Sequence, residues 1–390
     1  MRLRYNPFLI LLFCVSINFL LGFKHVWSVL VPYIEQDFNI SRSLSVLPFS
    51  IMSLTNIIGF LGIDYIKCKI GLRLTLILIT SASSFGLILT SLSQDILMLT
   101  ISYAGIYGIG HALGYVLAVT LSVKWFYNSR RGLAAGLTSG GYSLGTLLLA
   151  PITSFLTSYY GWRFTLLLLG FISLVVMGLA TLIIDEPSRN SYEETKSFSP
   201  LDLLRSKVFY VAWFMIFFTS LIDGFAVSHL TPFMVQYVGV SPLVASIGVS
   251  IYSAVNFFSR ILMGGLSERV GIHKILLAIY LLSTLNTILF PSYRNVISAY
   301  LGASVVGLIH GTNVAFTPLI AIIMWGSKYL GSNYGLLLTA STVSMFVGPM
   351  IGGLSYDTTG GYEAGLWILS LFSALGIPLL LIMWKNMKRA

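Results

Sequence analysis

Twelve apolar segments occupy this chain almost from end to end. Each is about 20 residues or longer, the length a helix needs to cross a hydrocarbon layer of about 30 Å. A backbone in lipid must satisfy its own polar groups, so the segments are expected to be helices. They fall at residues 8–33, 43–64, 72–93, 97–122, 131–158, 163–184, 207–236, 242–265, 273–291, 296–326, 334–356 and 363–384.

The segments form two sets of six that are offset by about 200 residues. Pro32 in the first segment is matched by Pro232 in the seventh, and the motif GIGH at 108–111 is matched by GLIH at 307–310. Two related six-helix halves are the layout of many secondary transporters. The sequence therefore predicts an all-α membrane protein with a half at 1–185, a cytoplasmic linker at 186–206 and a half at 207–390.

The composition agrees with a chain that lies almost wholly in lipid. It is 56% hydrophobic and 9% charged, whereas about a quarter of a soluble domain is charged. Cys14 and Cys68 provide neither a disulfide framework nor the spacing of a metal site. The linker is too short for a nucleotide-binding domain, and no Gly-rich phosphate loop occurs. We therefore expect no cofactor, no metal and no bound nucleotide.

The basic residues are distributed unevenly between the two sides of the predicted membrane. If the N-terminus is inside, eighteen of the 23 Lys and Arg residues face the cytoplasm, three face the outside and two lie within segments. Cytoplasmic loops carry such an excess, so both termini are predicted to be cytoplasmic, in a plasma or inner membrane. Topology and anionic lipid then explain the net charge of +10 without nucleic acid.

A loop signature follows the eighth segment. Residues 264–274 read GGLSERVGIHK, which resembles the loop signature of the major facilitator superfamily, G-x-L-x-D/E-R-x-G-x-R/K-K/R. A degraded copy stands at the equivalent place in the first half. The resemblance implies twelve helices in two pseudo-symmetric halves and a cytoplasmic gate, where glycines let helices approach and charges face helix ends. The gating residues expected here are Asp64, Arg73, Gly264, Glu268, Arg269 and Gly271.

Two other segments resemble a narrower branch, the monocarboxylate porters and oxalate–formate antiporters. Residues 125–145 read WFYNSRRGLAAGLTSGGYSLG, which is similar to that branch's fifth-segment signature and adds Arg130 and Arg131 to the gating set. Residues 256–264 are similar to its D-x-x-x-R-x-x-x-G motif, with Asn256 in place of the aspartate and Arg260 kept. Oxalate exchangers of the branch also use a lysine in the eleventh segment, and none occurs at 334–356.

Three charged residues lie well inside predicted segments: Lys24, Asp223 and Arg260. A charge at mid-membrane costs at least about 2.5–3.5 kcal/mol, so such residues usually have a partner or a function. Arg260 is the expected ligand of a substrate carboxylate, because a guanidinium can form two hydrogen bonds with it; the alternative is a structural ion pair. Lys24 is either a second carboxylate ligand or the partner of Asp223 in a proton-coupling switch. The resemblance leaves open whether Lys24 or His25 is the first-segment ligand.

The fourth segment has a row of aromatic residues at a spacing of four: Tyr103, Tyr107, His111 and Tyr115. Such a row lies on one helix face. It is either a packing stripe or the wall of a cavity that offers OH and NH donors to a small carboxylate. The resemblance implies that segments 1, 4, 7 and 10 line the cavity, which would add His310 and Asn313. Each buried histidine also has an ordinary structural reading as a contact between helices.

These features together indicate a secondary active transporter that works by alternating access, not an enzyme. Its expected partners are a small organic anion, for which a monocarboxylate is favoured, protons and the lipid bilayer, through symport or exchange. One alternative keeps the fold and carries a neutral or cationic compound, as drug or sugar exporters do. A second alternative is a polytopic membrane sensor.

Overall fold

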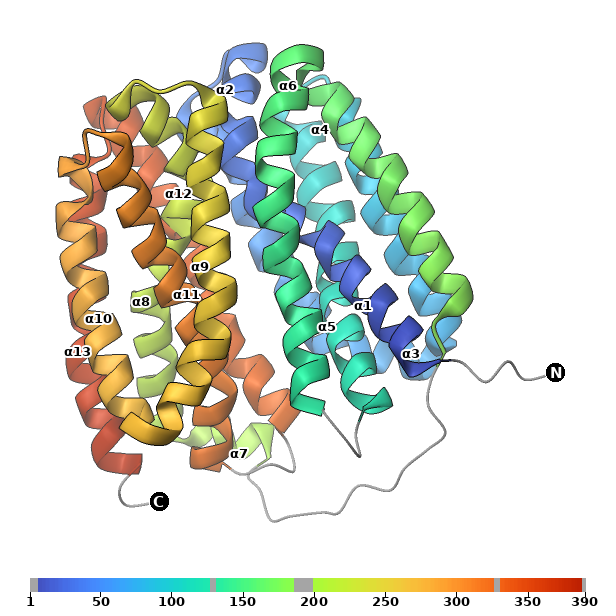
Figure 1. Ribbon diagram of the computed structural model, residues 1–390, viewed down its shortest axis with the longest axis vertical. Coiled ribbons are helices and arrows are strands. Elements are labelled where there is room, and N and C mark those ends of the chain that lie inside the picture. The colour runs from blue at the N-terminus through green and yellow to red at the C-terminus, as the bar shows by residue number, and fades with distance from the viewer. Residues whose placement is uncertain (1–5, 127–130, 186–198, 326–329, 388–390) are drawn as a thin grey trace. The chain divides into compact units, whose positions relative to one another are not determined.

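The computed structural model describes residues 6–126, 131–185, 199–325 and 330–387 (Figure 1). The chain divides into two compact units, one from Met1–Ile40 and Leu47–Asn190, the other from Ser41–Val46 and Ser191–Ala390. Ser41–Val46 overlap the start of the second predicted segment, residues 43–64, but cluster with the second unit. The backbone amides of Arg42 and Ser43 there donate to the Asp357 carboxylate, each at 3.0 Å.

The first unit is helical in all its described residues apart from short connections. Its elements are α1 (Pro7–Leu21), η1 (Gly22–Val26), α2 (Trp27–Phe38), α3 (Arg42–Ser91), α4 (Ile96–Thr100), η2 (Ile101–Tyr107), α5 (Gly108–Trp125) and α6 (Arg131–Ile183). The first turn of α3 belongs to the other unit, as described above. Two elements depart from α-helical geometry: η1 is a 3₁₀ turn and η2 is a π-helical turn.

The second unit repeats this pattern. Its elements are α7 (Pro200–Arg205), α8 (Lys207–Phe233), η3 (Met234–Val238), α9 (Pro242–Val270), α10 (Ile272–Leu289), η4 (Phe290–Ser292), α11 (Val296–Trp325), α12 (Leu330–Thr359) and α13 (Glu363–Met387). In Figure 1 these helices run in colour from yellow-green to red.

The predicted membrane-spanning segments are all found as helices. Among the described residues, eleven helical stretches are long and apolar enough to cross a membrane. One of them, Gly136–Ile183, has 48 residues and would be about 72 Å long at 1.5 Å per residue, more than twice the hydrocarbon thickness. It bends at Gly161, where φ is 83°, so it contains the fifth and sixth predicted segments. The predicted twelve-helix fold class is confirmed.

The sharp turns of the chain repeat at the same offset as the hydropathy. Among the described residues, backbone positions with positive φ form three pairs that are 199 or 200 residues apart: Asn39 and Gly239, Gly71 and Gly271, and Gly161 and Gly360. Five of the six are glycine, the residue that adopts this conformation without steric cost. The repeat therefore extends from composition to the positions at which the backbone reverses.

The same two close helix pairs occur in each unit. In the first unit, a Cβ at Gly145 of α6 would overlap the backbone of Phe19 in α1, and a Cβ at Gly59 of α3 would overlap Ala112 in α5. In the second unit, Gly348 of α12 lies equally close to Leu221 of α8, and Gly307 of α11 to Tyr252 of α9. Glycine at such crossings lets helix backbones approach, which is how membrane helices gain packing energy.

The end of the predicted linker that the structure describes is a short helix, α7. Ser199 caps it, since its hydroxyl accepts from the Asp202 amide at 3.3 Å while the Asp202 carboxylate accepts from the Ser199 amide and hydroxyl. This is a capping box. The hydrogen bond from the Ser199 hydroxyl, followed by that from its amide, lowers the pKa of Asp202. Residues 186–198 of the predicted linker lie outside the described part of the chain.

Candidate functional site

Lys24 lies where the first membrane span changes helical form. Its side chain is 5% exposed, and its Nζ lies 5.3 Å from the ring centroid of Phe49 on α3. An ammonium over an aromatic face is attracted to the ring electrons. The 3₁₀ turn that holds Lys24 begins at Gly22, whose carbonyl accepts a 2.8 Å hydrogen bond from the Thr146 hydroxyl of α6. The turn therefore places a buried cation beside an aromatic ring in the first unit.

Tyr142 of α6 brings together three predicted site residues of this unit. Its hydroxyl lies 3.2 Å from His111 Nε2. Its ring meets the ring of His25 edge to face, with centroids 5.0 Å apart, and that of Tyr115 at 5.5 Å. The other ring nitrogen of His111 lies 3.2 Å from the Asn56 side-chain oxygen on α3. His111 therefore contacts neutral partners from two helices.

The predicted aromatic row is present, and it extends to the first span. Ring centroids lie 5.1 Å apart between Tyr103 and Tyr107 and 6.0 Å apart between Tyr107 and His111, while Tyr103 packs on Trp27 of α2 at 4.4 Å. Tyr103 and Tyr107 are fully buried. Neither of their hydroxyl groups has a hydrogen-bond partner among the described residues. A buried hydroxyl left in this state costs about 1–3 kcal/mol, so packing alone does not explain these two phenols.

The second unit has a buried carboxylate at its centre. Asp223 of α8 is 1% exposed. Its Oδ1 accepts a hydrogen bond of 2.5 Å from the Tyr252 hydroxyl on α9, and its Oδ2 lies in hydrogen-bond contact with His310 Nδ1 on α11. One turn along α11, the Asn313 side chain accepts from the Tyr280 hydroxyl at 3.3 Å. The structure therefore joins predicted residues Asp223 and His310 directly.

Arg260 lies on the same helix as Tyr252 but two turns away. Its Nε donates to the Asn256 side-chain oxygen at 2.9 Å, and its side chain is partly buried. Eight residues of α-helix separate Tyr252 and Arg260 by about 12 Å along the helix axis. The contact with Asn256 orients the guanidinium through a neutral partner, where the motif of the resembling branch has an aspartate.

The predicted gating residues are only partly described. Gly71 and Gly271 form the turns with positive φ, Gly264 lies within α9, and Arg73 and Arg269 are exposed. Arg130 lies outside the described residues, as do the side chains of Asp64, Arg131 and Glu268.

Sequence reasoning missed three residues of these clusters: Asn56, Tyr142 and Tyr252. The sequence did contain a signal for Asn56, because Asn256 stands 200 residues later. Asn56 contacts His111 on a neighbouring helix, and Asn256 contacts Arg260 one helical turn away. Tyr142 lies within the 125–145 motif. Tyr252 carried no signal, because only helix packing shows that its hydroxyl meets Asp223.

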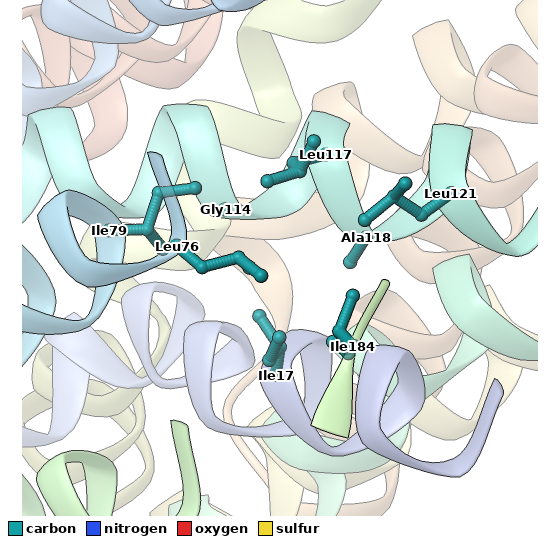
Figure 2. Close-up of a pocket in the computed structure, with 8 residues that line it drawn as sticks. All are labelled: Ile17, Leu76, Ile79, Gly114, Leu117, Ala118, Leu121 and Ile184. Carbon is teal, nitrogen blue, oxygen red and sulfur yellow. The ribbon is translucent and has the colours of Figure 1, made fainter. Parts of the chain in front are cut away.

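A narrow crevice in the first unit does not have the chemistry of an anion site. Ile17 of α1, Leu76 of α3, Leu121 of α5 and Ile184 are among the residues that line it, and all eight labelled residues in Figure 2 are apolar. A carboxylate requires hydrogen-bond donors or a cation. The crevice is therefore separate from the candidate site around Lys24 and His111.

The sequence model of the Major Facilitator Superfamily matches this chain at residues 10–349 and 231–389. The chain therefore belongs to the major facilitator superfamily of membrane transporters, whose members are not enzymes. This confirms the family and the multi-pass membrane character that the sequence predicted.

The similar curated proteins are transporters of organic acids by name. Human monocarboxylate transporter 12 is 26% identical over 92% of this chain and 75% of its own length. The oxalate:formate antiporter of Oxalobacter formigenes is 23% identical over 100% of this chain and 93% of its own length. A bacterial homolog of the human lysosomal transporter Spinster, solved in an inward-facing and occupied conformation, has a TM-score of 0.76 at 17% identity and covers 98% of this chain and 96% of its own. That likeness supports the fold.

Proposed function

We propose that this transporter carries small organic anions, with monocarboxylates as the substrate class, by alternating access. The observation that carries the proposal is the buried Lys24 in a unit that also holds two buried phenols without hydrogen-bond partners among the described residues. A carboxylate would be attracted to the ammonium and would accept hydrogen bonds from the phenols, which would remove the cost of burying the two hydroxyl groups unpaired. The names of the similar proteins point to the same substrate class.

Each unit contributes one proposed carboxylate ligand. In the first unit the ligand is Lys24, and the aromatic row of Tyr103, Tyr107 and Tyr115 with His25 and His111 provides an apolar wall with donors. In the second unit the ligand is Arg260, whose Nε donates to the Asn256 side chain and whose guanidinium stays charged at any physiological pH. His310 and Asn313 are the other proposed substrate-binding residues of the second unit.

Transport is proposed to be either proton-coupled or an exchange of one anion for another. Asp223 and Lys24 are the proposed coupling residues, because they are the buried acid and base that stand 199 residues apart in the two repeats. Oxalate is disfavoured as the substrate, because Asn333–Thr359 in α12 contains no lysine.

Counterflow in proteoliposomes tests the substrate class. Purified protein loaded with unlabelled L-lactate should take up labelled L-lactate or pyruvate from outside, and labelled glucose and tetraphenylphosphonium serve as neutral and cationic comparisons. Uptake of a monocarboxylate with neither comparison compound supports the proposal. Uptake of glucose or of the phosphonium alone would replace it with the neutral or cationic cargo, and a sensor would exchange none of them.

Both termini and the predicted linker are proposed to be cytoplasmic, in a cell membrane. The charge distribution supports this orientation, since basic residues accumulate on the side that faces the cytoplasm. Reporter fusions at Asn190 and Arg294 test it. The two fusions should report opposite sides of the membrane, and the same side for both would contradict the twelve-span orientation.

A further inference from the structure

The carboxylate of Asp223 has both of its oxygens engaged inside the second unit. Tyr252 from α9 donates to Oδ1 at 2.5 Å, and His310 from α11 contacts Oδ2. Asp223 is 1% exposed, and His310 is largely buried. Hydrogen bonds from an imidazole and a phenol stabilise the charged form of a carboxylate even where it is buried, and an imidazole beside it can take up a proton and balance its charge.

The groups that surround Asp223 within the unit are few. On α12, the backbone of Ser344 and Met345 and the ring of Pro349 lie against Gly224, the next residue of α8. Tyr280 of α10 donates to the Asn313 side chain, one turn along α11 from His310. On α13, Gly376 packs on Thr219. In the described part of the second unit, the titratable groups in contact with Asp223 are thus His310 and Tyr252.

We propose that Asp223, His310 and Tyr252 form the proton-binding site that couples transport. The inference rests on the proposed function, because it names the group that accepts the coupled proton. An ionised carboxylate only accepts hydrogen bonds, so Nδ1 of His310 carries its hydrogen toward Asp223. The incoming proton binds at Nε2 of His310, leaves a water molecule behind, and turns the imidazole into an imidazolium.

The site carries a charge of −1 before this step and 0 after it, since the phenol stays neutral. A proton-free site repels an entering anion, whereas a proton-bound site does not. Proton and anion therefore travel together, which gives symport. The sequence predicts a pairing of Asp223 with Lys24, as opposite charges at matching depth in the two repeats; in this proposal His310, which contacts Asp223, is the proton acceptor instead.

Gradient-driven uptake tests whether His310 binds the coupled proton or only makes a structural contact with Asp223. An electroneutral symport of one proton and one monocarboxylate accumulates L-lactate about tenfold per pH unit across the proteoliposome membrane, with the membrane potential clamped. His310→Asn keeps a donor near Asp223 but cannot bind the proton. We expect its accumulation ratio to fall to about one, while L-lactate counterflow at equal pH continues.

His229→Gln is the matched control. His229 is a buried histidine of α8 that contacts the Pro349 carbonyl at 2.8 Å, and a glutamine can keep that contact. This variant should accumulate L-lactate like the wild type. Full accumulation by His310→Asn would overturn the inference. So would a wild type that exchanges L-lactate but does not accumulate it, a result that leaves the proposed substrate class intact.

Infrared titration of the substrate-free protein tests the proton site without any assumption about the cargo. As the pH is lowered, the wild type should show the imidazole bands of His310 change to those of an imidazolium, with a shift of the bands of the ionised Asp223 carboxylate beside it. His310→Asn and Asp223→Asn should both lose it, and His229→Gln should keep it. A change that persists in His310→Asn overturns the proton site. Failure of wild-type L-lactate counterflow with an intact titration would instead reject the carboxylate proposal.

Discussion

The two units have the same frame but opposite charges at their centres. Lys24 and Asp223 stand 199 residues apart, as do His111 and His310. In the first unit the histidine contacts the neutral side chains of Asn56 and Tyr142, and in the second it contacts a carboxylate. Turns and close helix crossings repeat because they support folding in each half. Under the proposed mechanism, the site residues differ because an anion and a proton need different partners.

The outer ends of the units show the same divergence. In the first unit, Asp37 and Arg163 form an ion pair. At the positions 200 residues later, the Tyr237 hydroxyl donates to the Glu363 carboxylate at 2.8 Å. A contact between the same two helix ends is thus made with two charges in one half and with one charge in the other.

The largest expected effect comes from Arg260, which has Phe60 as its counterpart 200 residues earlier. Arg260→Ala should lower L-lactate uptake by about 100-fold, because two charge-assisted hydrogen bonds are lost. Arg260→Lys should recover little, since an ammonium lacks the planar two-point contact. Initial uptake rates, normalised to protein in the membrane, measure both, with Arg205→Ala on α7 as a control. Wild-type affinity in Arg260→Ala would favour a neutral cargo.

Asp223→Asn should separate coupling from exchange. Asparagine preserves the shape of the side chain but removes the negative charge that stabilises an imidazolium at His310. Accumulation driven by a pH gradient should fall from about tenfold per pH unit to about one, while exchange at equal pH persists. Unchanged gradient-driven uptake would show that the charge of Asp223 is not needed for coupling. The second unit would then have no proposed proton site to distinguish it from the first.

Tyr107→Phe should have opposite effects on affinity and stability. The Tyr107 hydroxyl is buried without a hydrogen-bond partner among the described residues, so its removal should raise the stability of the substrate-free protein by up to about 1 kcal/mol. If the phenol binds the anion, the affinity for L-lactate should fall by about tenfold. Thermal unfolding with and without L-lactate measures both quantities.

Tyr300→Phe in the second unit is the matched comparison. Its hydroxyl donates to the Val244 carbonyl at 2.7 Å, so this variant should lose stability by about 1 kcal/mol and keep its affinity for L-lactate. If Tyr107→Phe kept its affinity too, the aromatic row would be a packing stripe.

The fold could be predicted because its determinants are local or periodic. Segment length and the 200-residue offset predicted every span, although the first span extends to Phe38 through a 3₁₀ turn that no residue pattern indicated. The partners of Asp223 were harder to predict. Lys24 is also a charged candidate for the partner of Asp223, at the matching depth of the other repeat. Whether Tyr252 and His310 contact Asp223 depends on the rotation of α9 and α11 about their axes. Hydropathy does not determine that rotation.

The smallest expected effect concerns the two outer contacts. The side chains of Arg163 and Asp37 are 41% and 38% exposed, and exposed pairs contribute about 0–1 kcal/mol that salt screens. A double-mutant cycle of Asp37→Ala and Arg163→Ala should therefore give a coupling energy of about 0.5 kcal/mol that falls as salt rises. The cycle of Tyr237→Phe and Glu363→Gln should depend less on salt, because a phenol is uncharged and its hydrogen bond acts at contact distance. Arg294 also pairs with Glu363, at 3.3 Å. Equal salt dependence in the two cycles would mean that this ion pair dominates the second contact, so that an ion pair stabilises the contact in both units.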